Sequence, residues 1–178
     1  MRVLAAFVAV AALAALKPGA PAKEFSIPVP GGKTYRLADF KGKVVILEFL
    51  LTHCPACQNT GRLLQQMQDE YGPRGFQALG VAVDAQAATG MANYLNLTTA
   101  TFPIGIRTEN DFKAFAELSA FEVDKFPEIF VIDRAGVVRW YHGAPGDEAF
   151  LYNEERLLRS EVEMLLAAKP ALAGGKTK

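Results

Sequence analysis

Two cysteines, Cys54 and Cys57, are the side chains of this sequence best suited to covalent chemistry. They stand in the segment 52–57 (THCPAC) and are the only cysteines among the 178 residues. A disulfide between residues so close in sequence closes a very short loop, and the loop-entropy account gives such a bridge little stabilising power. The pair is therefore predicted to act through its reactivity rather than as a structural cross-link.

The cysteine pair lies where a predicted buried strand, Val44–Leu51, is followed by a predicted helix, Pro55–Tyr71. The first turn of a helix carries unpaired backbone N–H groups and the positive end of the helix dipole, and both favour a thiolate. Pro55 suits the first helical position because its missing N–H would have had no partner there. Cys54 is therefore predicted to be the exposed nucleophile of low pKa, and Cys57, one turn further, the buried resolving thiol.

Strands and helices alternate around this pair in a pattern typical of an α/β domain. Strand 44–51, helix 55–71 and a second apolar strand, 76–83, form a predicted right-handed crossover unit with parallel strands. The other expected elements are a hairpin over 25–27 and 34–37, helices over 85–97, 109–118 and 154–168, and strands over 102–106, 129–133 and 137–142. Together they predict a central mixed sheet with helices on both faces.

The N-terminal segment 1–22 has the composition of a targeting segment rather than of a domain. A cationic start precedes the apolar run 3–16, which is too short for a comfortable transmembrane helix, and small residues follow it. The segment is predicted to be a signal peptide or a membrane anchor through residues 3–16, and either places the protein in the periplasm or another extracytoplasmic compartment. Residues 23–170 then form one domain, and the tail 171–178 is predicted to be disordered.

Charge argues against one class of partner. The chain has 19 basic and 19 acidic residues, and its sequence has no basic stripe interleaved with aromatic residues. No nucleic-acid partner is therefore expected. No cofactor is predicted either, and the domain is expected to be a monomer.

The order of these motifs resembles the thioredoxin superfamily, and in particular its exported TlpA/ResA-like branch. The resemblance rests on the strand–CPAC–helix–strand arrangement, on the hairpin and the lead-in 37–43 (LADFKGK), and on Phe126-Pro127 before a later strand. It covers residues 24–168 and implies a thioredoxin-like α/β fold. It also implies an extracytoplasmic thiol–disulfide oxidoreductase that reduces disulfides in a protein substrate and is re-reduced by a membrane electron donor. Several members of that branch act in cytochrome c or copper-centre assembly.

The resemblance assigns roles to further positions. Pro127, after Phe126, matches a proline that is cis in the family and lies against the cysteine pair, where an extended backbone edge binds the substrate peptide. An ordinary proline at a strand entry is the alternative. Glu48, six residues before Cys54, stands where thioredoxins place a buried aspartate that moves a proton to or from the resolving cysteine. Burial raises the pKa of a carboxyl group, which suits that task; a core carboxylate held by a cation or a water pocket is the alternative.

Two positions depart from the family pattern. His53 replaces the tryptophan that usually precedes the first cysteine. Its imidazole either lowers the pKa of the Cys54 thiol by electrostatics or is a bystander at the surface. Glu128 follows Pro127, where a small hydroxyl or another neutral residue is commoner. We group His53 with Phe126 and Pro127 as predicted substrate-binding residues, and two titratable side chains at the rim would alter the usual substrate preference.

Two other functions compete with this prediction. Cys54, Cys57 and His53 offer two soft ligands and an imidazole for Cu(I), as in a metallochaperone. A closed zinc site needs four ligands, however, and the only other histidine, His142, is far along the sequence. A thiol peroxidase is the second alternative, but its motif has threonine three residues and proline seven residues before the reactive cysteine. This chain has leucine at both positions.

Overall fold

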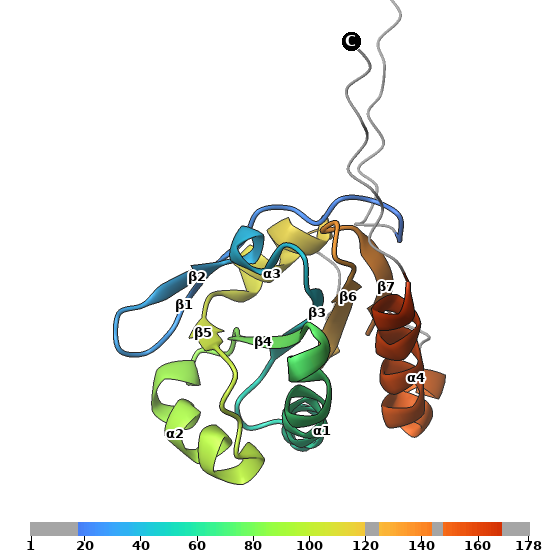
Figure 1. Cartoon of the computed structure of the whole chain (residues 1–178). Coiled ribbons are helices and arrows are strands. Elements are labelled where there is room, and N and C mark those ends of the chain that lie inside the picture. Colours follow the sequence, from blue (N-terminus) through green and yellow to red (C-terminus); the bar gives the residue numbers. More distant parts are fainter. Residues whose placement is uncertain (1–17, 120–124, 144–147, 169–178) are drawn as a thin grey trace, which may run out of the picture.

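A five-stranded mixed sheet forms the centre of the protein, which we describe from a computed structural model (Figure 1). The described residues are 18–119, 125–143 and 148–168. The predictions for the apolar run 3–16 and for the tail 171–178 lie outside these residues. They remain predictions.

The sheet has the strand order β5-β4-β3-β6-β7. Its strands are β3 (Val44–Leu50), β4 (Phe76–Ala82), β5 (Ile104–Ile106), β6 (Glu128–Ile132) and β7 (Val138–His142). β4 is parallel to both β3 and β5, whereas β6 runs antiparallel to β3, and β7 antiparallel to β6. This topology confirms the predicted mixed sheet, including the parallel pair on either side of the cysteine helix.

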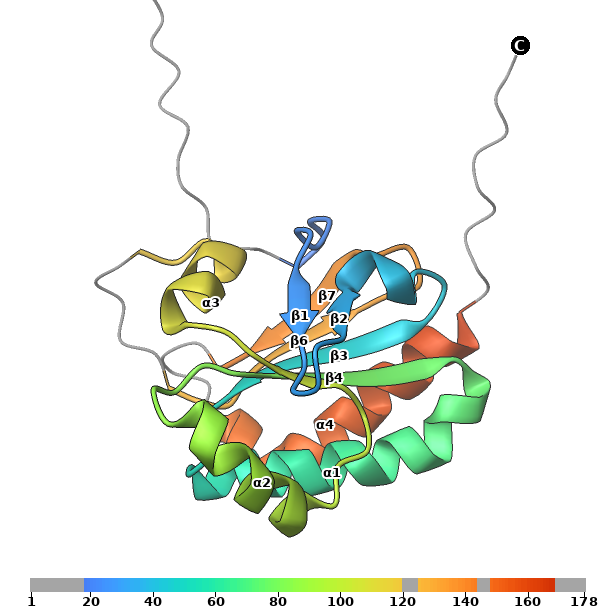
Figure 2. The ribbon, with the colours of Figure 1, turned by 90° about the vertical axis from the view of Figure 1, so that its left-hand side faces the viewer.

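Helices lie on both sides of the sheet (Figure 2). One side carries α1 (Pro55–Tyr71), α2 (Ala87–Thr98) and α4 (Glu148–Ala167). The other side carries α3 (Glu109–Ala116), the antiparallel hairpin of β1 (Ser26–Pro28) and β2 (Thr34–Arg36), and the short 3₁₀ helix η1 (Leu37–Phe40). A second 3₁₀ turn, η2 (Gly72–Arg74), ends the cysteine helix. Each side of the sheet has its own apolar core, so the central strands are covered twice, as their unbroken apolar sequences predict.

The alternation of side chains along β3 decides which core each of its residues enters. Successive residues of a strand point to opposite faces. Val45, Leu47 and Phe49 therefore pack on the side of α3, while Val44, Ile46 and Leu50 pack on the side of α1 and α4. Glu48 has the same parity as this second set. Its carboxyl group is thereby placed in the core between the sheet and the cysteine helix.

The last helix is longer than the sequence pattern indicates. It begins at Glu148, not at the predicted Glu154. Its first turns are fixed by Phe150, which is buried and stacks on the His142 ring at 4.2 Å between centroids. An isolated aromatic residue gives a weak periodic signal, so the apolar pattern becomes readable only one turn later. As a result Glu154 lies inside α4 and not at its end.

Residues 18–22 run beside β7 and the turn before it. The Gly19 N–H donates to the Val138 carbonyl at 2.7 Å, and the Ala22 N–H donates to the Gly136 carbonyl at 2.8 Å. This segment was assigned by its sequence to the targeting region, and here it covers the edge of the sheet. Where the targeting region ends remains a prediction.

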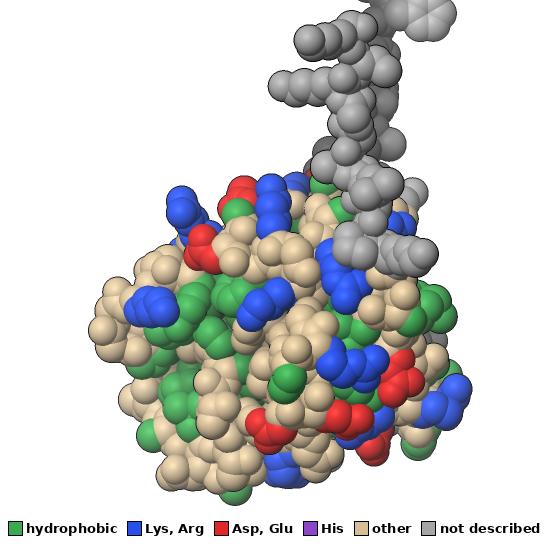
Figure 3. Space-filling model, in the orientation of Figure 1, with side chains coloured by type: hydrophobic (Ala, Val, Ile, Leu, Met, Phe, Trp, Pro, Cys, Tyr) green, Lys and Arg blue, Asp and Glu red, His purple; other side chains and the backbone are tan. Residues whose placement is uncertain are grey.

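The surface carries mixed charge. In the view of Figure 3, basic side chains are spread over the molecule with acidic side chains among them. Within the described ranges, no helix has both the length and the apolar composition needed to cross a membrane.

Candidate functional site

Cys54 caps the N-terminus of α1. Its backbone is extended, with φ −80° and ψ 120°, and its carbonyl accepts the first helical hydrogen bond, from the Gln58 N–H at 3.0 Å. Pro55 follows at the first helical position, as predicted. The side chain of Cys54 is partly exposed, and both cysteines are free thiols. The nucleophile predicted from sequence thus lies at the positive end of a 17-residue helix.

Cys57 lies one turn further along α1 and is completely buried. Its sulfur accepts a hydrogen bond from the Leu51 N–H at 3.5 Å. Burial is the main cause that raises the pKa of the Cys57 thiol far above its ordinary value, and the charge of Glu48 raises it further. A hydrogen bond with the Cys54 side chain acts in the same direction. Burial thus favours the protonated form of the Cys57 thiol, whereas the Cys54 thiol is partly exposed.

The segment Phe126-Pro127 lies against the cysteine pair. The peptide bond between the two residues is cis, as predicted from the resemblance. The Phe126 carbonyl accepts a weak hydrogen bond from the Cys54 thiol, with a distance of 3.8 Å between Sγ and O. The Phe126 ring packs edge-on against Phe112 of α3 at 5.5 Å between centroids. These contacts hold the entry to β6 beside the nucleophile.

Glu48 is buried beneath the pair. Its exposed fraction is 0%, and neither carboxyl oxygen has a hydrogen-bond partner among the described residues. Burial is the largest cause that raises the pKa of Glu48 well above its ordinary value, followed by the negative charges of Glu154 and Cys54. Burial thus favours the neutral, protonated form of this carboxyl group. A carboxyl group with a raised pKa beside a buried thiol is suited, in its ionised form, to accept the proton of that thiol.

His53 points away from this buried group. Its side chain is 65% exposed, and its Nδ1 atom lies 4.0 Å from Oδ2 of Asp84. Asp84 is nearly buried and accepts hydrogen bonds from the Thr52 backbone N–H at 2.7 Å and from the Thr52 hydroxyl at 2.9 Å. Asp84 thus fixes the loop in front of Cys54. Sequence analysis gave this residue no role, although its place at the end of a strand parallel to β3 puts it at the same edge of the sheet.

Glu128 does not lie at an exposed rim, contrary to expectation. Its side chain is buried, and its Oε2 atom accepts a hydrogen bond from the Tyr141 hydroxyl at 2.6 Å. The residue is the first of β6, and its side chain lies close to Gly143, which follows β7. Glu128 therefore supports the segment after Pro127 from beneath instead of facing a substrate.

Glu154 is a second carboxyl group that sequence analysis did not identify. It reaches from α4 to α1, where its Oε1 atom accepts a hydrogen bond from the buried Thr60 hydroxyl. It is partly buried, and burial raises its pKa. The only sequence signal that distinguishes Glu154 from other acidic residues is its position four residues before Leu158, which places it on the apolar face of α4.

The second histidine, His142, contacts the last helix and not the cysteine pair. His142 binds Glu161 of α4, with its Nε2 atom 2.9 Å from one carboxylate oxygen and 3.0 Å from the other. Among the residues that the structure describes, no group of three or more His, Cys, Asp or Glu side chains is arranged to hold a metal ion.

Comparisons with known proteins point to the same chemistry. Residues 18–141 match the AhpC/TSA family. The chain is 28% identical over 121 residues to the thiol-disulfide oxidoreductase ResA of Geobacillus thermodenitrificans, an alignment that covers 68% of this chain and 66% of the relative. It is 26% identical over 128 residues to the thioredoxin-like protein YneN of Bacillus subtilis, which covers 71% of this chain and 72% of the relative. The chain thus spans about two thirds of the length of the ResA relatives.

A solved structure gives the same result for the fold. A thiol:disulfide interchange protein of the thioredoxin family from Chlorobium tepidum superimposes on this chain with a TM-score of 0.67 and 28% identity. The match covers 85% of this chain and 99% of the other. The predicted thioredoxin-like fold is confirmed by this likeness.

Proposed function

The chain belongs to the AhpC/TSA family and has the thioredoxin-like fold, and on this premise we propose that it reduces disulfides in exported proteins through Cys54 and Cys57. Thiol–disulfide oxidoreductase is the activity that names its ResA relatives. The observation that carries the proposal is one helix start with a partly exposed thiol at Cys54 and a buried thiol at Cys57.

The proposed reaction has two exchanges. The Cys54 thiolate attacks one sulfur of a substrate disulfide, which forms a mixed disulfide and releases the other substrate sulfur as a thiolate. The Cys57 thiolate then attacks Sγ of Cys54, which forms the Cys54–Cys57 disulfide and releases the second substrate sulfur. Two electrons pass from the protein to the substrate, and the two departing thiolates take up protons.

Glu48 serves the second exchange in this proposal. Cys57 is protonated at rest because burial raises its pKa, so its proton must leave before the sulfur can attack. Glu48 raises the pKa of that thiol by its charge and faces it from β3. An ionised Glu48 would accept the Cys57 proton, and a protonated Glu48 would return it in the reverse direction.

Substrate binding is assigned to the surface around Cys54. Phe126 and Pro127 form its backbone edge, which can pair with an extended peptide by strand-like hydrogen bonds. His53 is exposed beside the nucleophile and contributes an imidazole to the same surface. We assign the protein to an extracytoplasmic compartment, where a membrane electron donor would return it to the dithiol form.

The direction of electron flow is tested by the reduction potential of the pair. Purified protein is equilibrated against thiol buffers of defined potential, and the dithiol and disulfide forms are counted by mass spectrometry. A potential near that of thioredoxin, about −270 mV, is expected for a reductant, whereas a value near −120 mV would mean an oxidant. The second value would overturn the proposed direction.

Serine variants test the proposed roles of the two sulfurs. Cys54→Ser is expected to abolish reduction of a protein disulfide, and Cys57→Ser to accumulate mixed disulfides with the substrate. Activity retained by Cys54→Ser would refute the mechanism. Tight stoichiometric Cu(I) binding without exchange would favour a metallochaperone, and rapid peroxide consumption by the reduced protein would favour a thiol peroxidase.

A further inference from the structure

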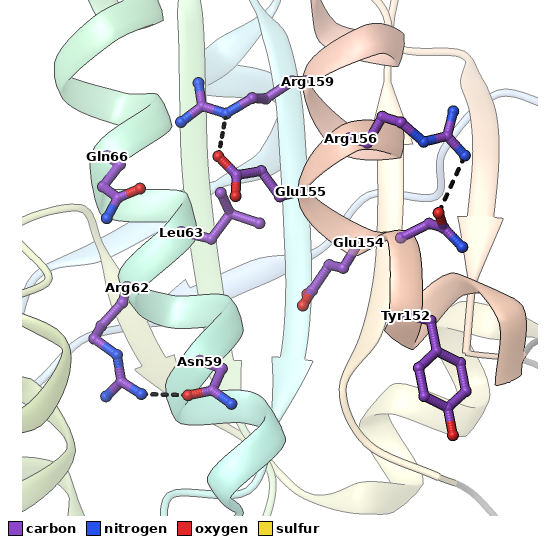
Figure 4. A pocket seen from close by; sticks show the side chains of 10 residues that line it. Asn59, Arg62, Leu63, Gln66, Tyr152, Glu154, Glu155, Arg156 and Arg159 are labelled. Atoms are coloured by element: carbon purple, nitrogen blue, oxygen red, sulfur yellow. Dashed lines mark hydrogen bonds and ion pairs between the residues drawn. The ribbon is translucent and has the colours of Figure 1, made fainter.

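An open groove of about 760 Å³ lies between α1 and α4 and is lined by residues of both helices. Figure 4 shows it from close by, with Glu154 extending from α4 towards α1. Residues that line it include Asn59, Arg62, Gln66, Glu154, Glu155 and Arg159. Arg62 is hydrogen-bonded to Asn59, and Arg159 is paired with Glu155 at 2.9 Å. Glu154, by contrast, is directed inward, to Thr60.

The contact between Glu154 and Thr60 accommodates either protonation state of the carboxyl group. The Thr60 hydroxyl lies 2.5 Å from Oε1 of Glu154 and 3.2 Å from the Ala56 carbonyl. When Glu154 is ionised, the hydroxyl donates its hydrogen to the carboxylate. When Glu154 is protonated, it can donate to the hydroxyl oxygen, and the hydroxyl hydrogen then turns to the Ala56 carbonyl. The carboxyl group can therefore gain and lose a proton without leaving a buried donor or acceptor unpaired.

Glu48 lies on β3, on the face of the sheet that α1 and α4 cover. Its carboxyl group is completely buried, and neither oxygen has a hydrogen-bond partner among the described residues. The charge of Glu154 is the largest electrostatic influence on it. The titratable groups that act on the two carboxyl groups are Cys54 and Cys57 of α1, Tyr94 of α2 and His142 of β7.

We propose that Glu154 carries protons between Glu48 and the water of the groove, so that the proton of Cys57 leaves through a groove whose lining includes none of the proposed substrate-binding residues. The inference rests on the proposed function, because it concerns the second exchange of that reaction. Glu154 acts through Glu48 and does not touch the sulfur atoms, so it is a positioning residue for the proton and not a catalytic residue.

The proton balance of the step is complete. Cys57 gives its proton to ionised Glu48, and its thiolate attacks Sγ of Cys54, which releases the substrate sulfur as a thiolate. Because Glu48 has no hydrogen-bond partner among the described residues, its proton would reach ionised Glu154 through a water molecule that enters from the groove, and Glu154 releases it to the water there. The departing thiolate takes a proton from solvent.

The electrostatics support this order of transfer. Burial raises the pKa of both carboxyl groups, but the hydrogen bond from Thr60 and the charge of His142 act to lower that of Glu154. Glu48 has no such compensation among the described residues. Glu154 therefore releases its proton to water more readily than Glu48 does, as the outer member of a relay should.

The two exchanges can be timed separately with the aromatic disulfide DTNB. Attack by Cys54 releases one thionitrobenzoate and leaves the other in a mixed disulfide, and attack by Cys57 then releases the second. Stopped-flow absorbance of the reduced protein should therefore show two phases. Glu154→Gln keeps the size and the hydrogen-bond acceptor of the side chain but cannot take a proton.

Glu154→Gln is expected to leave the first phase unchanged and to slow the second about tenfold near neutral pH, at the lower end of general acid–base effects. It also removes a negative charge near Glu48, so the pH midpoint of the second phase should fall by about one unit. Glu154→Asp, which keeps the carboxyl group, should recover part of the rate. Glu155→Gln is the matched control, since it removes an exposed carboxylate from the same groove, and both phases should be unchanged.

The possible outcomes distinguish a failure of the proposed disulfide exchange from a failure of the Glu154 proton relay. If the wild-type protein releases no second thionitrobenzoate, the proposed exchange through Cys57 fails. If the wild type shows both phases and Glu154→Gln matches it in rate and midpoint, exchange stands and the relay is overturned. An equal effect of Glu155→Gln would also overturn the relay, because a general change of groove charge would then explain the result.

Discussion

Replacing Glu48 with glutamine should make the reduced protein more stable, by an amount that grows with pH. Glu48 is completely buried, and its carboxyl oxygens have no hydrogen-bond partner among the described residues. Its pKa in the folded protein is raised well above the ordinary value of 4.5. The unfolded chain exposes the carboxyl group to water, where it ionises normally. The two states therefore bind different numbers of protons over a range of pH.

The sign and slope of the effect follow from this difference. Below pH 4.5 the carboxyl group is mostly protonated in both states, and its ionisation does not affect the folding equilibrium. Above that pH the unfolded state loses the proton while the folded state keeps it, so the free energy of unfolding falls by up to about 1.4 kcal/mol per pH unit. The fall ends where pH reaches the raised pKa of the folded state. Glutamine cannot ionise, so the variant loses this part of the pH dependence.

Urea denaturation at pH 5, 6 and 7 under reducing conditions measures the effect. The difference in free energy of unfolding between Glu48→Gln and wild type should rise by about 1.4 kcal/mol for each of these steps that lies below the folded pKa. The buried amide of glutamine adds an offset that does not depend on pH, and only the slope is diagnostic. Cys57 does not interfere in this window, because its ordinary pKa is 9.0 and its folded pKa is higher.

Two further variants check the interpretation. Glu48→Leu introduces an apolar side chain with a different constant offset, and it should give the same slope as glutamine. Gln66→Ala, on the exposed face of α1, changes no ionisable group and should give a difference that does not change with pH. A flat difference for both Glu48 variants would refute the argument, because it would mean that Glu48 is ionised in the folded protein at these pH values.

Packing and thiol burial lead to two further expectations. Gly61→Ala should lower the free energy of unfolding by about 1–2 kcal/mol, because the added methyl group would clash with the Tyr94 hydroxyl and this overpacking outweighs the gain in helix propensity. Gln66→Ala, on the exposed face of α1, is the control for urea denaturation. Equal stabilities of the two variants would contradict the packing argument. Iodoacetamide should modify Cys54 on the order of tenfold faster than Cys57, because Cys57 is buried and its pKa is raised. Peptide mass spectrometry measures both alkylation rates. Equal rates would contradict the roles assigned to the two cysteines.

The cysteine helix was predictable from local sequence because every signal for it is local. Pro55 and the two cysteines mark its start, and an apolar stripe with three- and four-residue spacing follows. Gly72-Pro73 ends the pattern, and the structure places the last helical residue at Tyr71. The position of Glu48 was equally accessible. It follows from the two-residue period of a strand, once that strand is known to lead into the cysteine helix.

The partners of the site were not predictable in the same way. Thr60 and Glu154 are 94 residues apart in sequence, and they meet only because α4 packs on α1 at a particular angle. No local pattern encodes that angle. Glu154 also lies close to the predicted start of its helix, where an acidic residue is normally explained by the helix dipole. The true start at Glu148 removes that explanation and leaves the contact with Thr60 as the reason for its inward orientation.

Asp84 and Glu128 show the limit of reading a residue by its type. Asp84 ends an apolar strand, where an aspartate is common in turns, yet it accepts two hydrogen bonds that hold the loop before Cys54. Glu128 was expected at an exposed rim because it directly follows Pro127. It is buried instead, since its position in β6 turns its side chain towards Tyr141. Burial and partner depend on tertiary contacts, which residue type alone does not determine.

The burial of Glu48 and Cys57 together restricts the charge that this pocket can hold. Burial favours the neutral form of each, and a charge on either one further disfavours a charge on the other. The pocket therefore tolerates at most one negative charge, located on oxygen or on sulfur. In the proposed second exchange the charge starts on Glu48 while the thiol is protonated, and it moves to the Cys57 sulfur when Glu48 takes the proton. An apolar residue at position 48 would remove the cost of burying a carboxyl group, but it would leave the Cys57 proton without the base that the proposed second exchange requires; that exchange would account for the unfavourable burial of Glu48.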